Sequence, residues 1–454
     1  MDFRSIFDVA ANMSELAVAT PDKYSHLKTS FARDLEQIDP FFGKAGTQPC
    51  PICFRVDQVV QLKKLAETLH GIIETVTQMY VNGNAELLEL FSQYAIYKPF
   101  MIRQLEHFQV YGRYDFLVNT QGNIVFLETN SAMPGGFIPV GITNDRFANR
   151  ISGEFEVPHC RGEYSDPGAE LGGSIKRMMR KFSTASGAIA IVTDENQKYN
   201  EINLIRGALE GAGLTVYVGP VDELQHRIGY RMSGEGEAVT ALYNKMRLFG
   251  SKHSWKAGAL SHHHGFLEAV SDNNVLLINN VAAMTITEDK AIFAAFRLPS
   301  VRAALSDEEN AFIDAHTPES FLLDQHSFDG EYRGIFEEVL SDPEEWIVKP
   351  RNDYQGLGAS SGRDHTKDSW TDLVRSLAKG DVPYLAQRRV DSFLYNSAQV
   401  GSTGAVSIDQ ARLAGGIYYR NGKFGNIVGR ASTAEIANVS SGAAYLVPVV
   451  YEVT

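Results

Sequence analysis

Charged and amide side chains recur at two-residue spacing in YGRYDFLVNTQGNIVFLETN, residues 111–130. With a two-residue turn at positions 121 and 122, residue 119 pairs with residue 124, and Asp115 lies opposite Glu128. The same register places Arg113 opposite Asn130. All four side chains then share one face of a hairpin, because side chains alternate along strands. Mg²⁺ usually takes one or two carboxylates together with substrate phosphates. The pattern therefore predicts a magnesium site, with the solvated face of an amphipathic hairpin as the alternative.

The opposite face of this hairpin is apolar and is expected to face the core. Its members are Tyr114, Phe116, Val118, Val125 and Leu127.

A second candidate site lies in IVKPRNDYQGLGASSG, residues 347–362. Lys349 ends an apolar run and is followed by a loop that contains Gly356 and Gly358. An ammonium group beside backbone N–H groups can bind phosphate, and Asp353 could reach a metal ion on that phosphate. An ordinary Lys-Pro turn has the same composition and stays open as the alternative. Lys290, in TEDKAIFAAF, is expected in the first turn of a helix, either at a phosphate or simply solvated.

Three cysteines in 454 residues rule out a disulfide framework. Cys50 and Cys53 form a C-x-x-C pair, but a structural zinc site needs four ligands. Cys160 and the distant histidines 262–264 are the remaining candidates, and Pro51 does not suit a redox pair at the start of a helix. We interpret the cysteines as ordinary, partly buried thiols and the histidine triplet as a solvated loop.

The N-terminal part of the chain is expected to be mainly helical. Apolar residues recur at helical spacing from 59 to 79, and Asp57 is the predicted N-cap of that helix. A second helix is predicted at residues 86–97. Residues 149–168 are polar and rich in Gly and Pro, so we interpret them as a loop.

A β-α-β unit is predicted in the middle of the chain after a short helix near 171–182. No G-x-G-x-x-G follows its first strand, which argues against a dinucleotide site. We therefore expect a small substrate or lid domain. Its strands and helix are expected at 188–192, 201–209 and 214–218, with a further strand at 275–278 and a helix from about residue 288.

The last third is expected to consist mainly of strands, at 346–349, 384–390 and 411–419, the last with a hairpin partner. Asn421-Gly422 is typical of a type I′ hairpin turn.

The composition is acidic, with 42 Lys and Arg against 55 Asp and Glu and a net charge of −13. This balance argues against a general affinity for nucleic acid or anionic membranes. No apolar run approaches the roughly 18 residues of a membrane span, and the N-terminal residues lack a signal peptide's architecture. We expect a cytoplasmic protein with no nucleic-acid or membrane partner. Residues 349–454 are mildly basic, with 12 Lys and Arg against nine Asp and Glu, as a polyanionic ligand would favour.

The order of these motifs resembles the ATP-grasp ligases. It is similar in particular to the circularly permuted branch that includes eukaryotic-type glutathione synthetase and glutathionylspermidine synthetase. The resemblance runs from about residue 95 to the C-terminus. It is carried by Arg113-Tyr114-Asp115, Phe126-Leu127-Glu128-Thr129-Asn130, Glu288-Asp289-Lys290, Ile347-Val348-Lys349-Pro350, Gln387-Arg388-Arg389-Val390 and the C-terminal segment GRASTAEIANVSSGA.

The fold class that this resemblance implies is α+β or α/β. We expect an ATP-grasp fold with mixed and antiparallel sheets, a helical N-terminal region and a small α/β lid or substrate domain. Three domains follow: residues 1–185 with the metal-binding hairpin, 186–285 as the α/β unit, and 286–454 as the nucleotide-binding domain.

The activity that the resemblance implies is an ATP- and Mg²⁺-dependent carbon–nitrogen ligase. The γ-phosphate of ATP passes to a carboxylate, an amine attacks the acyl phosphate, and ADP and phosphate are released. The partners are then a small-molecule carboxylate and an amine, with a carrier-protein-bound acyl substrate and a homodimer left open. The alternatives are a thioester-forming ligase or phosphotransferase on the same fold, and a catalytically silent nucleotide-binding protein.

The resemblance also implies a role for each matching residue. Arg113 stabilises charge during phosphoryl transfer, and Arg430 grips a substrate carboxylate unless it is an ordinary surface arginine. The family often has an acidic hinge residue where this chain has Arg388, so Gln387 or the backbone must read adenine. The implied magnesium ligands are Asp115, Glu128, Asn130 and, more weakly, Asp353. The implied ATP-binding residues are Lys290, Lys349, Gly356, Gly358, Gln387, Arg388 and Val390.

Overall fold

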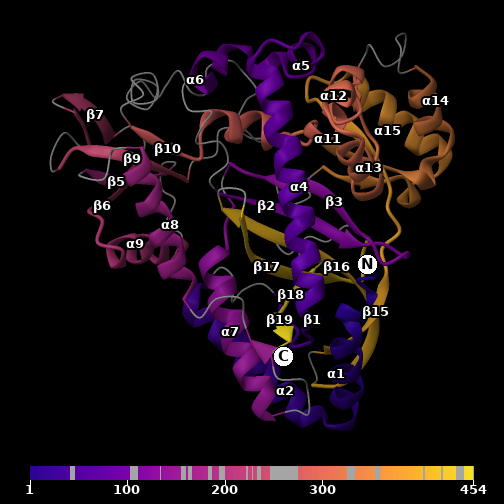
Figure 1. Ribbon diagram of the computed structural model, residues 1–454. Coiled ribbons are helices and arrows are strands. Elements are labelled where there is room, and N and C mark those ends of the chain that lie inside the picture. The colour runs from indigo at the N-terminus through magenta and orange to yellow at the C-terminus, as the bar shows by residue number, and fades with distance from the viewer. Residues whose placement is uncertain are drawn as a thin grey trace.

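The fold is built on a central sheet in which the hairpin of residues 111–130 pairs with strands from the C-terminal part of the chain (Figure 1). The computed structural model describes residues 1–40, 46–102, 111–132, 134–154, 160–161, 166–182, 187–193, 200–220, 223–227, 229–232, 237–245, 275–324, 333–352, 358–401, 404–420, 423–435 and 444–452. The central sheet has the order β18 (Tyr445–Val447), β17 (Lys423–Ser432), β16 (Val406–Arg420), β2 (Tyr111–Val118) and β3 (Ile124–Asn130), and β15 (Leu394–Val400) pairs with the outer half of β16. The predicted C-terminal hairpin of β16 and β17 is confirmed.

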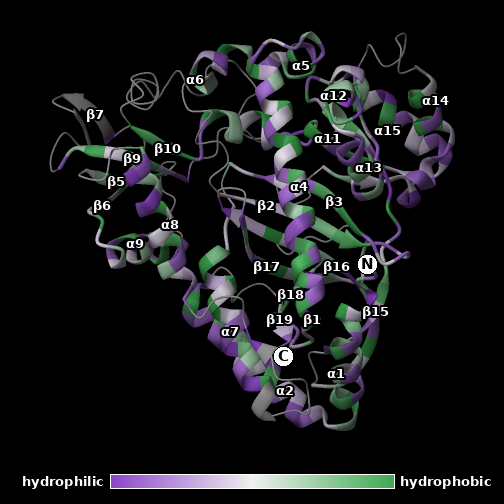
Figure 2. Cartoon of the chain, in the orientation of Figure 1, coloured by the Kyte–Doolittle hydropathy of each residue, from purple (hydrophilic) through white to green (hydrophobic). Residues whose placement is uncertain are grey.

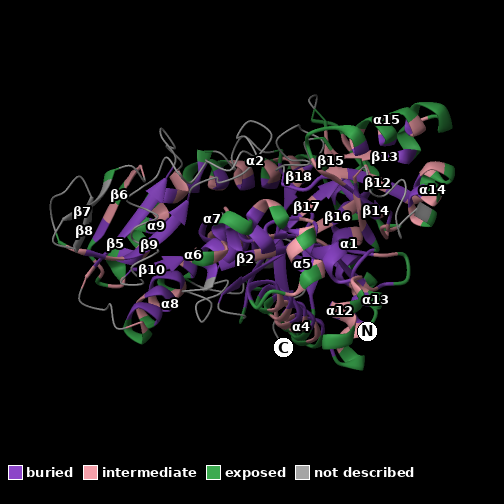
Figure 3. Ribbon diagram, turned by 90° about the horizontal axis from the view of Figure 1, so that it is seen from above, coloured by how far each residue is buried: buried purple, intermediate pink, exposed green. Residues whose placement is uncertain are grey.

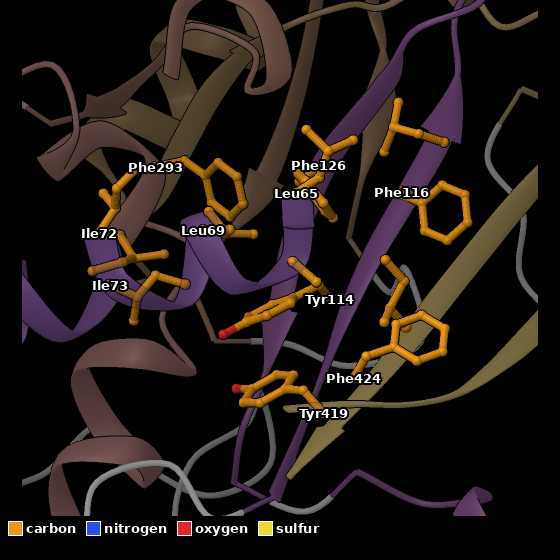
Figure 4. Packing of buried hydrophobic residues seen from close by; sticks show 14 of the residues in the cluster. Leu65, Leu69, Ile72, Ile73, Tyr114, Phe116, Phe126, Phe293, Tyr419 and Phe424 are labelled. Atoms are coloured by element: carbon orange, nitrogen blue, oxygen red, sulfur yellow. The ribbon is translucent and has the colours of Figure 1, made fainter. Parts of the chain in front are cut away.

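Helix α4 (Val56–Val81) lies across this sheet (Figure 1). Its apolar stripe, visible as alternating bands in Figure 2, is buried. Leu65, Leu69 and Ile72, labelled in Figure 4, belong to one core cluster with the aromatic residues Tyr114, Phe116 and Phe126 of the sheet. The predicted helix is confirmed, but its predicted cap is wrong. Arg55 is the N-cap, and its backbone N–H donates to Gln58 Oε1 at 3.0 Å.

The remaining N-terminal helices pack around the sheet, and two predictions are corrected here. The predicted helix at 86–97 is divided at Phe91, where a 3-10 turn begins. The predicted loop at 149–168 begins as helix, because Phe147 and Ile151 continue a buried face and Phe147 meets Phe31 edge to face at 5.1 Å. The elements are η1 (Arg4–Phe7), α1 (Asp8–Ala19), α2 (Pro21–Ile38), α5 (Ala85–Leu90), η2 (Ser92–Tyr97), α6 (Lys98–Ile102) and α7 (Phe137–Glu154).

The predicted β-α-β unit is confirmed. Strands β5 (Ala188–Thr193) and β6 (Val216–Pro220) are parallel, and α9 (Asn200–Gly211) connects them after α8 (Pro167–Lys181). Strands β9 (Val239–Lys245) and β10 (Leu276–Ile278) extend the parallel part, so that the carboxyl ends of β5, β9 and β10 lie at one edge. The antiparallel pair β7 (Leu224–Arg227) and β8 (Gly229–Met232) completes this sheet.

A third sheet carries the predicted Lys349 strand. Its order is β11 (Ser320–Leu323), β14 (Tyr384–Arg388), β12 (Trp346–Pro350) and β13 (Ser360–Ser361). Helices α14 (Arg333–Ser341) and α15 (Lys367–Lys379) cover it with a core that includes Trp346 and Trp370, while the outer face of α15 is exposed (Figure 3). The elements between this sheet and β10 are η5 (Ala283–Thr287), α11 (Ile292–Ala295), α12 (Pro299–Ala304) and α13 (Asp307–His316), and the short turns η7 (Pro343–Glu345) and η8 (Gly362–Asp364) flank β12 and β13.

A small sheet pairs the C-terminal strand with two strands from the first part of the chain. Its order is β1 (Ile52–Phe54), β19 (Val449–Glu452) and β4 (Cys160–Arg161). Cys53 lies in β1 and Cys50 just before it; both side chains are buried, in line with the interpretation of this pair as ordinary thiols. Histidines 262–264 lie outside the described residues. In the part of the chain that the structure describes, no helix has the length and apolarity needed to cross a membrane.

The register of the β2–β3 hairpin agrees with the prediction at the end far from the turn and differs near the turn. Arg113 pairs with Asn130 and Asp115 with Glu128, but Val118, not Asn119, pairs with Ile124. A β-bulge at Leu127 absorbs the difference of one residue. Ile124 and Phe126 therefore join Tyr114 in one core cluster. Val125 is buried as predicted, whereas Leu127 is only half-buried, so the prediction that Leu127 faces the core is wrong. Figure 4 shows the resulting stack of Tyr114 on Tyr419, with ring centroids 4.0 Å apart.

Candidate functional site

A buried ion-pair cluster lies on β2 and its neighbours. Arg113 Nε and Nη2 donate to the two carboxylate oxygens of Asp115 at 2.6 and 3.0 Å. Arg430 on β17 adds a third contact, with its Nη2 2.8 Å from Asp115 Oδ2. The side chain of Asp115 is 8% exposed, against 17% for Arg113 and 19% for Arg430. The structure thus brings together two predicted arginines and one predicted carboxylate.

The electrostatics of this cluster favour the charged forms of Asp115 and Arg113. Burial acts to raise the pKa of Asp115, but the charges of Arg113 and Arg430 outweigh burial and hold that pKa well below its usual range. Burial likewise acts to lower the pKa of Arg113, and the carboxylate of Asp115 reverses the effect. A carboxylate held in this way fits the role of a counter-ion that orients two guanidinium groups.

Gly416 leaves the space that this cluster needs. It lies on β16 opposite Asp115, between β2 and the β17 strand that carries Arg430. A Cβ atom at this position would lie 2.7 Å from Arg113 Cδ and 2.8 Å from Asp115 Oδ1. The sequence analysis did not identify Gly416 as a site residue, although the pair Gly415-Gly416 inside an apolar strand is a signal of close approach.

The bulge at Leu127 connects the hairpin to the third sheet. Lys349 Nζ donates to Leu127 O at 3.2 Å and to Gln387 Oε1 at 2.7 Å. Gln387 Nε2 in turn donates to Ser320 Oγ at 3.0 Å. The amide of Gln387 is therefore hydrogen-bonded at both ends, and its predicted adenine contact requires exchange of at least one of these bonds.

Two predicted lysines lie around Glu128. Lys290 Nζ is 3.7 Å from Glu128 Oε2, and Asn130 Nδ2 is 3.4 Å from Glu128 Oε1. Burial lowers the pKa of Lys349 to about 8, and the carboxylate of Glu128 opposes this shift while the neighbouring Lys290 adds to it. Among the described residues, no carboxylate oxygen lies within 4.0 Å of Lys349 Nζ. Its ammonium group is thus half-buried near a second ammonium group.

A buried network that the sequence analysis did not identify holds Lys290 in place. Asp289 is fully buried, and Arg351 binds it through Nε at 2.9 Å and Nη2 at 2.7 Å. Tyr94 donates to the same carboxylate at 3.0 Å, and the backbone N–H of Lys290 donates to Arg351 O at 3.1 Å. Lys290 itself lies in the turn between η5 and α11, so its predicted place in the first turn of a helix is wrong.

Glu288 is a second residue that sequence reasoning did not assign. Its carboxylate accepts from the backbone N–H groups of Ser131 and Ala132, directly after Asn130. Burial raises the pKa of Glu288 to about 7, although both backbone hydrogen bonds oppose the shift. In the sequence, the only signal for Glu288 is the acidic pair Glu288-Asp289 directly before Lys290. The contacts of Glu288 with Ser131 and Ala132 are visible only in the structure.

Two further residues predicted to bind the nucleotide, Arg388 and Val390, lie at the end of β14 and after it. Arg388 points away from Lys349 and Gln387: it lies over Trp346 at 4.6 Å and pairs with Glu319 at 2.8 Å and Glu338 at 2.7 Å. Strand β14 ends at Arg388, so the prediction that this strand extends to Val390 is wrong.

The glycine loop is described only at its end. Gly358 adopts a positive φ of 74°, and a Cβ there would lie 2.8 Å from Tyr384 Oη. Gly356 and Asp353 lie outside the described residues.

The fit of Mg²⁺ to this site depends on the oxygen donors. Glu128 and Asn130 share one face beside two lysines and offer the hard oxygen donors that Mg²⁺ prefers. Asp115 does not fit as well, because Arg113 and Arg430 occupy its oxygens. Within the described residues, which leave out Asp353, no group of three or more His, Cys, Asp or Glu side chains is arranged for a metal ion.

A small pocket lies beside the end of the hairpin, at the carboxyl ends of β9 and β10. Its lining includes Tyr111, Ala132, Pro134, Asn244 and Asn279. The α/β unit and the hairpin therefore border a shared space, as open α/β sheets commonly do at their carboxyl edge.

Comparison with known proteins identifies the fold. No protein-family model and no curated protein sequence matches the chain. A glutathione synthetase-like effector from Globodera pallida, solved in its apo form, superposes with a TM-score of 0.57 at 10% identity, covering 92% of this chain and 96% of the effector. A putative gamma-glutamylcysteine synthetase from Methylobacillus flagellatus gives a TM-score of 0.43 at 14% identity over 81% of this chain and 87% of its own.

The first superposition shows a shared fold along nearly the whole chain. The predicted fold class is confirmed: the protein has a mixed α+β architecture with parallel and antiparallel sheets, consistent with an ATP-grasp-like fold. The division into three domains stays a prediction, as does the role of each site residue.

Proposed function

We propose that this protein is an ATP- and Mg²⁺-dependent carboxylate–amine ligase that forms an amide or peptide-like bond and releases ADP and phosphate. The observation that carries the proposal is the pair Lys290 and Lys349 beside Glu128, at the edge of the cluster of Arg113, Asp115 and Arg430. The shared fold with a glutathione synthetase-like protein supports it.

The two lysines are proposed to bind the triphosphate of ATP. Lys349 is held by Leu127 O and Gln387 Oε1, which are neutral acceptors, so a phosphate oxygen would supply its counter-charge. The network of Asp289 and Arg351 fixes the backbone at Lys290, which limits the entropy lost when phosphate binds. Backbone N–H groups of the glycine loop with Gly356 and Gly358 would complete this set.

Arg113 is proposed as the catalytic residue. The substrate carboxylate attacks the γ-phosphorus, the bond to the bridging oxygen of ADP breaks, and an acyl phosphate forms. The amine nitrogen then attacks the acyl carbon, loses a proton, and phosphate leaves with the electron pair of the broken C–O bond. Negative charge moves across the reacting oxygens in both steps, and a fixed guanidinium group stabilises such charge. Asp115 would hold Arg113 and Arg430 in position, with Arg430 facing a substrate carboxylate.

Glu128 and Asn130 are the proposed magnesium ligands, with phosphate oxygens and Asp353 as further donors. When bound, Mg²⁺ would neutralise phosphate charge. For Asp115, the contacts favour the role of counter-ion over that of ligand. Adenine recognition is proposed for the segment of Gln387, Arg388 and Val390, mainly through its backbone.

The carboxyl edge of the α/β unit, beside the hairpin, is proposed to bind one of the two substrates. The acid and the amine are proposed to be small metabolites, with a carrier-protein-bound acyl group as the alternative form of the acid. Water must be excluded from the acyl phosphate, because it would otherwise hydrolyse this intermediate.

The test is a phosphate-release screen of the purified protein with MgATP over pairs of amino acids, polyamines and other small acids and amines. We expect phosphate and ADP in equal amounts for at least one pair, and a hydroxamate when hydroxylamine replaces the amine. Formation of AMP would contradict the proposal. Phosphate release to an acceptor without any hydroxamate would indicate a phosphotransferase, and ATP binding without turnover for every pair would indicate a silent binding protein.

A further inference from the structure

Glu201 connects the α/β unit to the segment that follows the catalytic hairpin. It lies in the first turn of α9, and its Oε2 is 3.0 Å from Lys245 Nζ at the end of β9. The two side chains are 12% and 5% exposed. The other carboxylate oxygen, Oε1, accepts from the backbone N–H of Gly136 at 2.5 Å. One carboxylate thus joins an ion pair inside the α/β unit to the backbone next to α7.

The turn at Gly135 and Gly136 leaves little room for a side chain on the Glu201 side. A Cβ atom at Gly135 would lie 3.1 Å from Glu201 Oε2. The backbone of the turn therefore lies against the carboxylate, so we expect a displacement of Glu201 to move the turn.

Tyr418 holds the same turn from the central sheet. Its hydroxyl donates to Gly135 O at 2.5 Å, and the side chain is almost fully buried. Tyr418 pairs with Arg113 across β16 and β2, and Arg113 Cζ lies 5.9 Å from the centre of the Tyr418 ring. The turn is thus held on one side by Glu201 and on the other by a tyrosine that contacts Arg113.

From this chain of contacts we propose that Glu201 is a positioning residue for Arg113, acting through the turn at Gly135 and Gly136 and through Tyr418. The proposal rests on the proposed ligase function, in which Arg113 stabilises the transition state. It gives the α/β unit a role in catalysis besides forming part of the pocket, because the unit's position then affects how well Arg113 is placed. A shift of about 1 Å in such a group can lower a rate about 100-fold.

A competing explanation is that Glu201 only neutralises the buried Lys245. The two roles differ in what they need from residue 201. Neutralisation needs a negative charge, whereas positioning needs an oxygen that accepts from Gly136 N–H. Glu201→Gln keeps the acceptor and loses the charge, and Glu201→Ala loses both.

The first test compares these variants in the phosphate-release assay at a temperature where each is folded. For Glu201→Ala we expect kcat to fall about 10- to 100-fold with KM for ATP within about twofold of the wild type. Glu201→Gln should keep most of kcat. The matched control is Glu210→Ala on the same helix, which removes an exposed pair with Arg206 at 2.7 Å and should leave kcat unchanged. Equal loss in the Gln and Ala variants, or an unchanged kcat in the Ala variant, would overturn the proposal.

The second test asks whether Glu201 and Tyr418 act through the same turn. Tyr418→Phe removes the hydroxyl that donates to Gly135 O. In a double-mutant cycle of Glu201→Ala and Tyr418→Phe, we expect the double variant to lose no more kcat than the worse single variant, because residues that act as one unit are not additive. Losses that multiply would contradict action through one turn.

A third measurement does not depend on enzymatic activity. Hydrogen exchange of the peptide that contains Gly136 should be faster in Glu201→Ala than in the wild type and unchanged in Glu210→Ala. If the wild type releases no phosphate with any substrate pair, the proposed ligase function fails whatever the exchange result. If the wild type is active and the exchange of this peptide is unchanged in Glu201→Ala, the positioning role fails and the ligase function stands.

Discussion

The partly buried charge of Lys349 should destabilise the folded protein. We therefore expect Lys349→Met to stabilise the fold and at the same time to remove nucleotide binding. The ammonium group lies among the neutral acceptors Leu127 O and Gln387 Oε1, and burial lowers its pKa from 10.5 to about 8. Met has a similar length and needs no hydrogen bond. We expect the two consequences to occur together in one variant, because the same unpaired charge causes both.

The magnitude follows from the pKa difference. A drop from 10.5 to about 8 corresponds to roughly 3.5 kcal/mol at about 1.4 kcal/mol per unit. Lys349 keeps part of its surface in solvent, and screening reduces this value. The variant also loses two hydrogen bonds of about 1 kcal/mol each. We therefore expect Lys349→Met to gain on the order of 1 kcal/mol of unfolding free energy at pH 7.

The sign of the pH dependence is fixed by linkage. Below pH 8 the lysine is charged in both the folded and the unfolded chain, so the folded wild type carries the full penalty. Between about pH 8 and pH 10.5 the unfolded chain binds more protons than the folded one, so the stability of the wild type rises with pH. The advantage of the Met variant should be largest near pH 7 and should shrink above pH 8.

The assay combines thermal melts at pH 7 and pH 9.5 with calorimetric titration of a non-hydrolysable ATP analogue in the presence of Mg²⁺. We expect a higher Tm for Lys349→Met at pH 7 and a loss of at least about tenfold in affinity. Wild-type affinity should itself fall as the pH rises through about 8. Lys379→Met, at an exposed position of α15, is the matched control and should change neither quantity. A variant that keeps its affinity, or whose melting temperature falls equally at both pH values, would refute the reasoning.

The remaining predictions concern the hairpin and its neighbours. Asp115→Asn should destabilise the protein by about 3–5 kcal/mol in denaturant unfolding, because it leaves two arginines without their carboxylate; a loss below about 1 kcal/mol would contradict this. Glu128→Gln should raise the Mg²⁺ concentration for half-maximal phosphate release about tenfold, EDTA should abolish release from the wild type, and an unchanged Mg²⁺ dependence would exclude Glu128 as a ligand. Gly416→Ala should lower kcat at least about tenfold because its Cβ would displace Arg113, whereas Gly207→Ala, with open space around it, should not; equal activities would show that Arg113 need not be held in place.

Local patterns were sufficient for the elements that carry the site. Period-two alternation predicted the hairpin and the cross-strand pairs of Arg113 with Asn130 and of Asp115 with Glu128, and helical spacing predicted α4. These signals act within a few residues, so a sequence displays them directly. The turn register was wrong by one residue, because the bulge at Leu127 is set by the core on one face and by Lys349 on the other.

The sequence by itself determined which residue types stand where: the acidic and amide pair of the hairpin, the two lysines, the glycine loop and the buried α/β unit. Tertiary structure alone decided that Asp115 is held between two arginines, one of them 315 positions away, that Gln387 binds Lys349, and that Glu201 reaches the turn beside Tyr418. These contacts join segments that no local pattern relates, and their energies depend on burial and on distances of a few ångström. The chemistry of each side chain is local, but its charge state and its partner are properties of the fold.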